Sequence, residues 1–146
     1  MKRFVQFICI ALIFVTVFSC TAFAAEPVDP RASMFFGASS VYFWHVSGSQ
    51  YQIWFDVTAK STMTELGTSK IVVEQSSDLV NWTPVRTYRK ADYSQMTTTS
   101  GTVRYANYVT YYPTDGYAYR AIVTLYAKNS NGTGEMDEET EILDLR

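Results

Sequence analysis

Apolar and polar residues alternate along much of the chain beyond residue 37, which is the pattern of half-buried β-strands. Residues 51–59 (YQIWFDVTA) are the clearest case: the odd-numbered positions are mostly aromatic or aliphatic, and the even-numbered ones are mostly polar. Successive side chains of a strand point to opposite faces, so we expect Ile53, Phe55 and Val57 to be buried together. Residues 117–128 (YAYRAIVTLYAK) repeat this alternation over twelve positions.

The same signals predict seven strands and no helix. Each segment is rich in β-branched and aromatic residues and ends at a group of turn-forming residues. Pro84 lies inside one segment, which we therefore expect to be an edge strand or to contain a bulge. Such spacing predicts an all-β fold, a single seven-stranded antiparallel β-sandwich, with an open barrel as the alternative. The predicted strands cover residues 40–46, 51–59, 69–76, 82–88, 102–112, 117–128 and 139–145.

The beginning of the chain has the pattern of a secretory signal peptide. The basic pair Lys2-Arg3 precedes an uncharged apolar run, residues 4–18, and residues 22–24 (AFA) form a small-x-small cleavage sequence. The run is shorter than the roughly 20 residues of a transmembrane helix. We therefore expect a protein that is secreted and extracellular or at the cell surface. Its parts are a signal peptide (1–24), an extended leader (25–36) and a β-sandwich domain (37–146).

Both cysteines, Cys9 and Cys20, lie in the expected signal peptide. Its removal leaves a domain without a disulfide and without a thiol for catalysis or metal binding. Small secreted animal domains usually carry disulfides, so the sequence favours a bacterial protein. The residues before Cys20 resemble a bacterial lipobox, which leaves lipidation at Cys20 as an alternative. We expect membrane contact only through the signal peptide or through this lipid.

The charge distribution argues against nucleic acid as a partner. The chain has 12 basic and 14 acidic residues, for a formal charge of −2, and loss of Lys2 and Arg3 makes it −4. The acidic residues gather near the end of the chain. A small basic group on an acidic secreted protein is not a nucleic-acid footprint. That basic group consists of Arg86, Arg89, Lys90 and Arg104.

The chain carries no catalytic or cofactor motif. His45 is the only histidine, and it lacks the spacing of a zinc site or the partners of a triad. Residues 127–138 have an EF-hand-like spacing, but Ala127 stands where calcium needs an aspartate oxygen. We interpret this stretch as a hairpin turn followed by a solvated acidic strand. We predict no cofactor, no metal site and no enzymatic activity; a small glycosidase with two carboxylates is the less favoured alternative.

Residues 76–82 (SSDLVNW) resemble the Asp-box turns of sialidase-type propellers, with Val80 in place of the usual glycine. In such a turn an aspartate accepts hydrogen bonds from the amides of its own loop, and a tryptophan packs beneath it. A propeller needs several blades, and this chain has room for one or two. The resemblance therefore implies a hairpin in which Asp78 is a turn residue and Trp82 a packing residue.

The segment that begins at Tyr119 resembles the penultimate strand of fibronectin type III domains. Its pattern is Y-x-A-x-V-x-L-x-A-x-N, followed by Gly132 and Gly134. The resemblance implies an immunoglobulin-like sandwich in which Tyr117 or Tyr119 forms a tyrosine corner, with its hydroxyl bonded to backbone. A fold of this kind implies no particular function.

Aromatic residues make up 16% of the chain, and both faces of residues 102–112 carry tyrosine although only one face can be core. Exposed Tyr and Trp supply contact area at low entropic cost. The alternative is that a second sheet and the loop 90–101 cover both faces. We predict a binding or structural module that contacts a protein through exposed aromatics or a sheet edge; the alternative partner is an extracellular or cell-wall polysaccharide. The candidate contact residues are Trp54, Tyr108, Tyr112 and Arg104.

Overall fold

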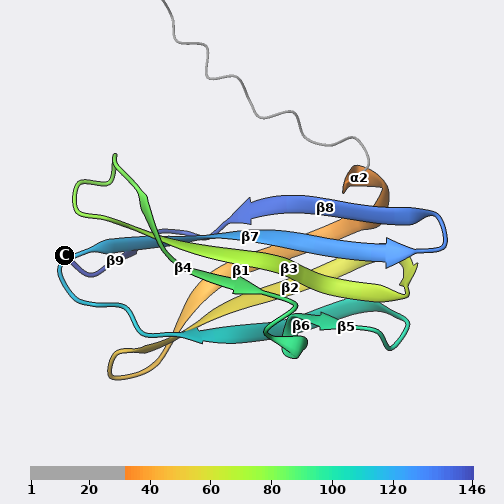
Figure 1. Ribbon diagram of the computed structural model, residues 1–146, viewed down its shortest axis with the longest axis horizontal. Helices are drawn as coiled ribbons and strands as arrows, with labels where there is room; N and C mark the ends of the chain where they lie inside the picture. The colour runs from red at the N-terminus through yellow and green to blue at the C-terminus, as the bar shows by residue number, and fades with distance from the viewer. Residues whose placement is uncertain (1–31) are drawn as a thin grey trace, which may run out of the picture.

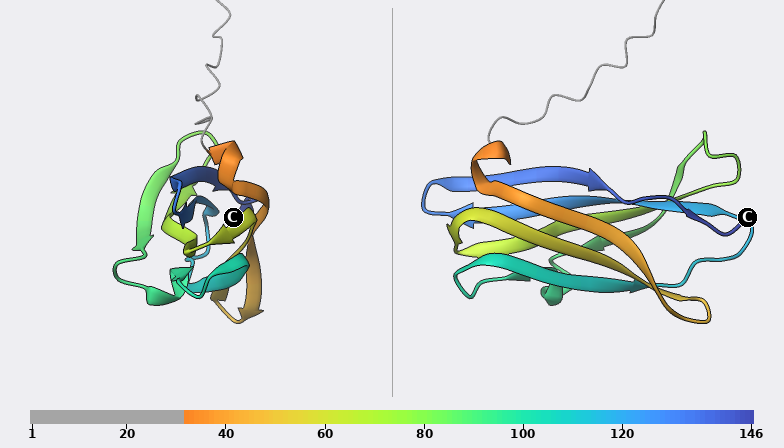
Figure 2. Two further views of the ribbon diagram at one scale, coloured as in Figure 1. Left: turned by 90° about the vertical axis from the view of Figure 1, so that its right-hand side faces the viewer. Right: turned by 180° about the vertical axis from the view of Figure 1, so that it is seen from behind.

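The computed structural model describes residues 32–146; the expected signal peptide, Cys20 and most of the expected leader lie outside the described residues. Almost all regular structure in the described part is β-strand, arranged as two antiparallel sheets with the core between them (Figures 1 and 2). Within residues 32–146, no helix has the length and apolarity needed to cross a bilayer. The predicted all-β class with two antiparallel sheets is confirmed.

The smaller sheet contains three strands in the order β1-β2-β6. Its central strand β2 buries Ile53, Phe55 and Val57 completely, as the alternation predicted. Partner residues run straight across the sheet along most of its length, with irregularities near the strand ends. The strands are β1 (Phe36–Ser47), β2 (Gln50–Met63) and β6 (Thr102–Tyr111).

The larger sheet contains six strands along the path β4-β3-β7-β8, with β5 beside β3 and β9 beside β7. Pro84 lies on the edge strand β4, and the β3–β4 register shifts next to it. Both features that the proline predicted are therefore present. The strands are β3 (Glu65–Ser76), β4 (Thr83–Arg89), β5 (Thr97–Thr98), β7 (Ala118–Asn129), β8 (Gly132–Glu139) and β9 (Leu143–Asp144).

In the described part of the chain the strands form two separate sheets, and neither sheet closes on itself. The pairing path ends at β1 and β6 in one sheet and at β4 and β8 in the other. Side chains from both sheets meet in one buried cluster, in which Phe55 of β2, Ile71 of β3 and Leu125 of β7 are fully enclosed. A short 3-10 turn (Ser94–Met96) adds the buried Met96 to this core.

The end of the expected extended leader belongs to the packed domain. Residues Ala32–Phe35 form the single helical turn α2, and Phe36 opens β1. Phe35 and Phe36 are each 6% exposed and join the core. A Cβ on Gly134 of β8 would lie 2.5 Å from the Phe35 ring, so that ring rests directly on the β8 backbone. Two adjacent large apolar side chains favour burial over an extended, solvated leader.

The last strands also differ from the expectation. Residues 129–134 were expected to be a turn, and a final strand was expected at 139–145. The turn is shorter, β8 already begins at Gly132, and β9 comprises only Leu143–Asp144. Acidic residues occupy the exposed positions of β8 while Met136 faces the core. An edge strand tolerates such charge, and β8 is the acidic strand that was expected to follow the hairpin turn.

Candidate functional site

Aromatic side chains gather on the outer face of the three-stranded sheet. Tyr42 of β1, Trp54 of β2 and Tyr108 of β6 are register partners across the sheet. The Tyr42 and Trp54 rings lie 6.5 Å apart and nearly parallel, and the Trp54 and Tyr108 rings lie 4.9 Å apart with a tilt of 40°. Trp44, two residues along β1 from Tyr42, is 58% exposed, and Tyr42 is 40% exposed. We call these four residues the aromatic face.

The alternation of β2 explains why this face points to solvent. Ile53 and Phe55 enter the core, so Trp54 between them must lie on the opposite side of the sheet. The register then places Tyr42 and Tyr108 beside it. Cross-strand aromatic pairs stabilise a sheet, which accounts for part of this clustering. It does not account for Trp44, whose cross-strand partner is Gln52.

The polar groups of this face are bonded to one another. The Arg104 guanidinium donates from Nε to Asp56 Oδ1 at 2.9 Å and from Nη2 to Asp56 Oδ2 at 2.5 Å. These bonds hold the pKa of Asp56 below its usual value. Trp54 Nε1 donates to Gln52 Oε1 at 2.9 Å. Arg104 thus lies at the aromatic face, but it is already engaged by a carboxylate.

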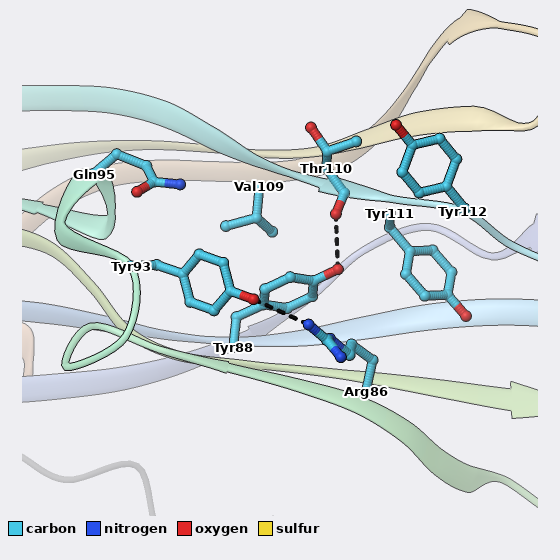
Figure 3. A pocket seen from close by; sticks show the side chains of 8 residues that line it. All are labelled: Arg86, Tyr88, Tyr93, Gln95, Val109, Thr110, Tyr111 and Tyr112. Atoms are coloured by element: carbon cyan, nitrogen blue, oxygen red, sulfur yellow. Dashed lines mark hydrogen bonds between the residues drawn. The ribbon is translucent and has the colours of Figure 1, made fainter.

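A pocket of about 520 Å³ opens between the edge strands β4 and β6 (Figure 3). Tyr112, one of the expected contact residues, follows the last residue of β6, lies at the edge of this pocket and is 63% exposed. The pocket is lined by Arg86, Tyr88, Tyr93, Gln95, Val109, Thr110, Tyr111 and Tyr112.

Hydrogen bonds and ring contacts fix the pocket side chains. Arg86 Nη2 donates to the Tyr93 hydroxyl at 3.0 Å, and its guanidinium carbon lies 5.2 Å from the centre of the Tyr88 ring. The Tyr88 hydroxyl donates to the Thr110 carbonyl at 2.8 Å. Burial raises the pKa of Tyr88, and burial raises the pKa of Tyr111 to about 12. Both phenols therefore stay protonated at neutral pH.

Side chains also occupy the free edge of β6. The Thr102 hydroxyl accepts from the Arg104 N–H and donates to the Arg104 carbonyl. The Asn107 side chain accepts from the Tyr108 N–H, and Tyr88 donates to the carbonyl of Thr110. Groups that are bonded in this way are not available to an added strand, which is how proteins protect sheet edges.

Tyr119 and Tyr117 lie on either side of the boundary between turn and strand. The buried Tyr119 hydroxyl accepts from the Thr114 N–H at 3.0 Å and donates to the Thr114 carbonyl at 2.9 Å. Tyr117 precedes β7 and is exposed, and its backbone carbonyl accepts from the Leu145 N–H. The backbone contact expected of a tyrosine corner is therefore made by Tyr119.

Asp78 organises the turn between β3 and β4. Its Oδ1 accepts from the N–H groups of Val80 and Asn81, and the Ser76 hydroxyl also donates to it. These bonds, led by the one from the Asn81 amide, hold the pKa of Asp78 well below its usual value. Trp82 at the end of the turn is half-buried, with the Arg120 guanidinium 4.5 Å from a ring centre.

The outer face of the six-stranded sheet carries ion pairs of Arg120 and Lys90 where the other sheet carries its aromatic row. Arg120 of β7 binds Glu74 at 2.8 Å and Glu139 at 3.2 Å. Lys90 binds Glu65 at 3.0 Å and lies 3.5 Å from the centre of the Tyr126 ring. The two outer faces of the sandwich are therefore chemically distinct.

No protein-family model, curated protein or solved structure matches this chain. Among residues 32–146, no group of three or more His, Cys, Asp or Glu side chains is placed to hold a metal ion.

Sequence reasoning missed several residues of these surfaces. Tyr42 and Trp44 lie in a stretch (SVYFWHV) whose two faces are both apolar, so alternation did not reveal which set is outward. Arg86 and Tyr93 lie close together only because β4 turns back through the loop that follows it. The one signal in the sequence was the alternation of residues 86–88, which places Arg86 and Tyr88 on the same face of the strand.

Proposed function

We propose that this protein is a non-catalytic binding or structural module that contacts a protein partner through its aromatic face. The observation that carries the proposal is the in-register row of Tyr42, Trp54 and Tyr108 on the outer face of β1-β2-β6. Trp44 extends this row along β1 and is more than half exposed. Tyr42 is exposed as well, while Trp54 and Tyr108 are half-buried beside it. Apolar patches that reach the surface in this way mark interaction sites.

Residue type supports a protein as the partner. Tyr, Trp and Arg are enriched in the energetically dominant parts of protein interfaces, and they are the residue types of the aromatic face and the adjoining pocket. Their rings lose little conformational entropy on binding, because the register already holds them in a row. The protected edge of β6 favours a side-chain contact over strand addition at that edge.

The finer fold assignment is part of the same proposal. We infer an immunoglobulin-like or fibronectin type III-like sandwich, which the Tyr119 contact with the Thr114 backbone supports. We also infer secretion, from the signal-peptide pattern of residues 1–24, and a bacterial source, from the absence of cysteine after Cys20 in the sequence. A secreted binding module that faces an extracellular partner is consistent with all three inferences.

An extracellular polysaccharide is the second candidate partner, and one observation favours it. The planes of Tyr42 and Trp54 differ by only 5°, as in a platform for a flat ligand. The Tyr108 ring is inclined by 40° to Trp54, so the platform does not continue across the third strand. We therefore rank the polysaccharide below a protein.

A hydrolase ranks lower still. A glycosidase needs a pair of carboxyl groups in a cleft, one of them with a raised pKa. None of the described residues that line the pocket is Asp or Glu. The pKa of Asp56 at the aromatic face is lowered rather than raised, because Arg104 bonds to its charged form.

The proposal is tested by comparing variants on the two outer faces. The wild-type protein is used to capture partners from the surrounding extracellular fraction, and a captured protein is purified so that its Kd can be measured directly. We expect Trp54→Ala to weaken binding at least tenfold, because central aromatic anchors dominate such interfaces. Tyr126→Ala, on the opposite sheet, is the matched control and should leave Kd unchanged.

A parallel co-sedimentation with insoluble polysaccharides separates the two candidates. Pelleting that Trp54→Ala abolishes would assign the face to a polysaccharide and contradict the protein-binding proposal. If wild type and Trp54→Ala bind the captured protein with equal Kd, the aromatic face is not the binding surface.

A further inference from the structure

We propose that the pocket between β4 and β6 binds an acidic side chain, Asp or Glu, of the protein that contacts the aromatic face. The inference rests on the proposed function and deepens it, because it names the chemistry of a second contact on the same partner. It is carried by the surroundings of Arg86, by the pocket around it and by the continuity of that pocket with the aromatic face.

Arg86 differs from three other arginines of the described chain in what it binds. Arg104, Arg120 and Arg146 each bind a carboxylate of this protein. Arg86 instead bonds to the hydroxyl of Tyr93 and lies over the ring of Tyr88. A guanidinium has five N–H donors in a planar fork that matches a carboxylate, and the Tyr93 hydroxyl takes only one of them.

The surrounding tyrosines hold Arg86 in place for such a ligand. Figure 3 shows the guanidinium bonded to the Tyr93 hydroxyl and next to the Tyr88 ring, at the side of the pocket. The Tyr88 and Tyr93 rings meet edge to face, with centres 5.2 Å apart. A donor group that is already ordered loses less entropy on binding, so each bond to the ligand contributes more to affinity. A bidentate pair of hydrogen bonds between arginine and an ionised carboxylate is among the stronger polar contacts in proteins.

The pocket and the aromatic face lie next to each other along β6, because Tyr108 belongs to the face and Thr110, two residues further on, lines the pocket. Trp44, Gln52 and Thr110 are register partners across β1, β2 and β6, so Thr110 continues the row that Trp44 begins. Thr110 also lines the pocket, where its carbonyl accepts from Tyr88. A partner segment that crosses the aromatic face toward β6 therefore reaches the pocket at Thr110.

Charge complementarity selects the occupant. The pocket presents a cation and protonated phenols, and none of the described residues in its lining is acidic. The ligand that fits is an anion with a flat, two-oxygen head, which a protein supplies as Asp or Glu. A uronic acid carries the same group, so the test below compares the two sources.

The test is a titration of isotope-labelled protein monitored by NMR. The probe is a blocked pentapeptide of alternating threonine and glutamate; its matched control has glutamine in place of each glutamate. We expect the glutamate peptide to shift the resonances of Arg86, Tyr93 and Tyr112 and the glutamine peptide to bind at least tenfold more weakly. Arg86→Gln should lose this tenfold preference, whereas Arg89→Gln, on the same strand but outside the pocket lining, should keep it.

Three results would overturn the proposal: equal binding of the two peptides, an unchanged preference in Arg86→Gln, or an oligogalacturonate that binds at the pocket as tightly as the glutamate peptide. The last result would assign the site to acidic sugars. Each result concerns the pocket and leaves the Trp54 test of the proposed function unchanged, so failure of one proposal is distinguishable from failure of the other.

Discussion

Tyr119 connects the core of the sandwich to the turn that precedes β7. Its ring is buried and packs edge to face on Tyr111 at 5.7 Å, while its hydroxyl bonds to both backbone groups of Thr114. A single side chain thus fixes the path of the chain between β6 of one sheet and β7 of the other. The exposed Tyr117 provides a natural comparison two residues away.

Removal of the Tyr119 hydroxyl should therefore destabilise the protein. We expect Tyr119→Phe to lower the free energy of unfolding by about 1–2 kcal/mol, because two hydrogen bonds are lost while the ring remains. Tyr117→Phe should change it by less than about 0.5 kcal/mol. Urea unfolding followed by tryptophan fluorescence measures both. Equal stability of the two variants would mean that the Thr114 contact does not hold the turn.

At this scale the sequence is informative when the contacts are local. The role of Asp78 was predictable because its amide partners lie two and three residues away. The sequence did not show whether Tyr117 or Tyr119 makes the tyrosine-corner contact. Both are odd-numbered positions next to the same turn, so alternation places them on the same face. The strand begins at Ala118, so only Tyr119 lies within β7 and enters the core.

At the scale of the elements, β3 packs closely against the backbone of residues 96–98 at Gly67. Gly67 has a φ of +148°, and a Cβ there would lie 2.2 Å from the Met96 carbonyl oxygen and 2.8 Å from the Thr97 Cα. These are backbone atoms of the segment that pairs with β3 as β5. A side chain at Gly67 would push β5 and the buried Met96 away from the core.

Gly67→Ala should therefore be among the most damaging single substitutions in the chain. We expect it to lower the free energy of unfolding by about 3 kcal/mol or more, because backbone strain and a backbone clash add. Gly37→Ala is the matched control: its Cβ would have no neighbour closer than 3.5 Å, and we expect a change within about 0.5 kcal/mol. Thermal unfolding followed by circular dichroism compares them, and a Gly67→Ala protein as stable as the control would contradict this packing.

The pattern of the sequence predicted elements well where one face is apolar and the other polar. β2 is such a strand, and its buried set was predicted correctly. β1 has apolar side chains on both faces, so Tyr42 and Trp44 could not be assigned to the outer one without the register. β8 was expected as an acidic strand after a hairpin turn, but its beginning at Gly132 was not, because glycine and acidic residues carry little strand signal.

At the scale of the whole molecule, the outer faces of the two sheets carry different kinds of side chain. The six-stranded sheet carries ion pairs of Arg120 and Lys90 with glutamates. The three-stranded sheet presents the aromatic face, and the pocket with Arg86 opens where the two sheets meet at β4 and β6. Sequence alone indicated an aromatic surplus, but only the pairing of distant strands shows that it forms one row.

The most direct test of the account is to map the surface that the captured protein partner covers. Amide resonances of the labelled protein are compared before and after the unlabelled partner is added. We predict that the largest shifts and broadening fall on β1, β2 and β6 around Tyr42, Trp54 and Tyr108. Changes confined to β7 and β8 of the six-stranded sheet, with the aromatic face unaffected, would contradict the central claim.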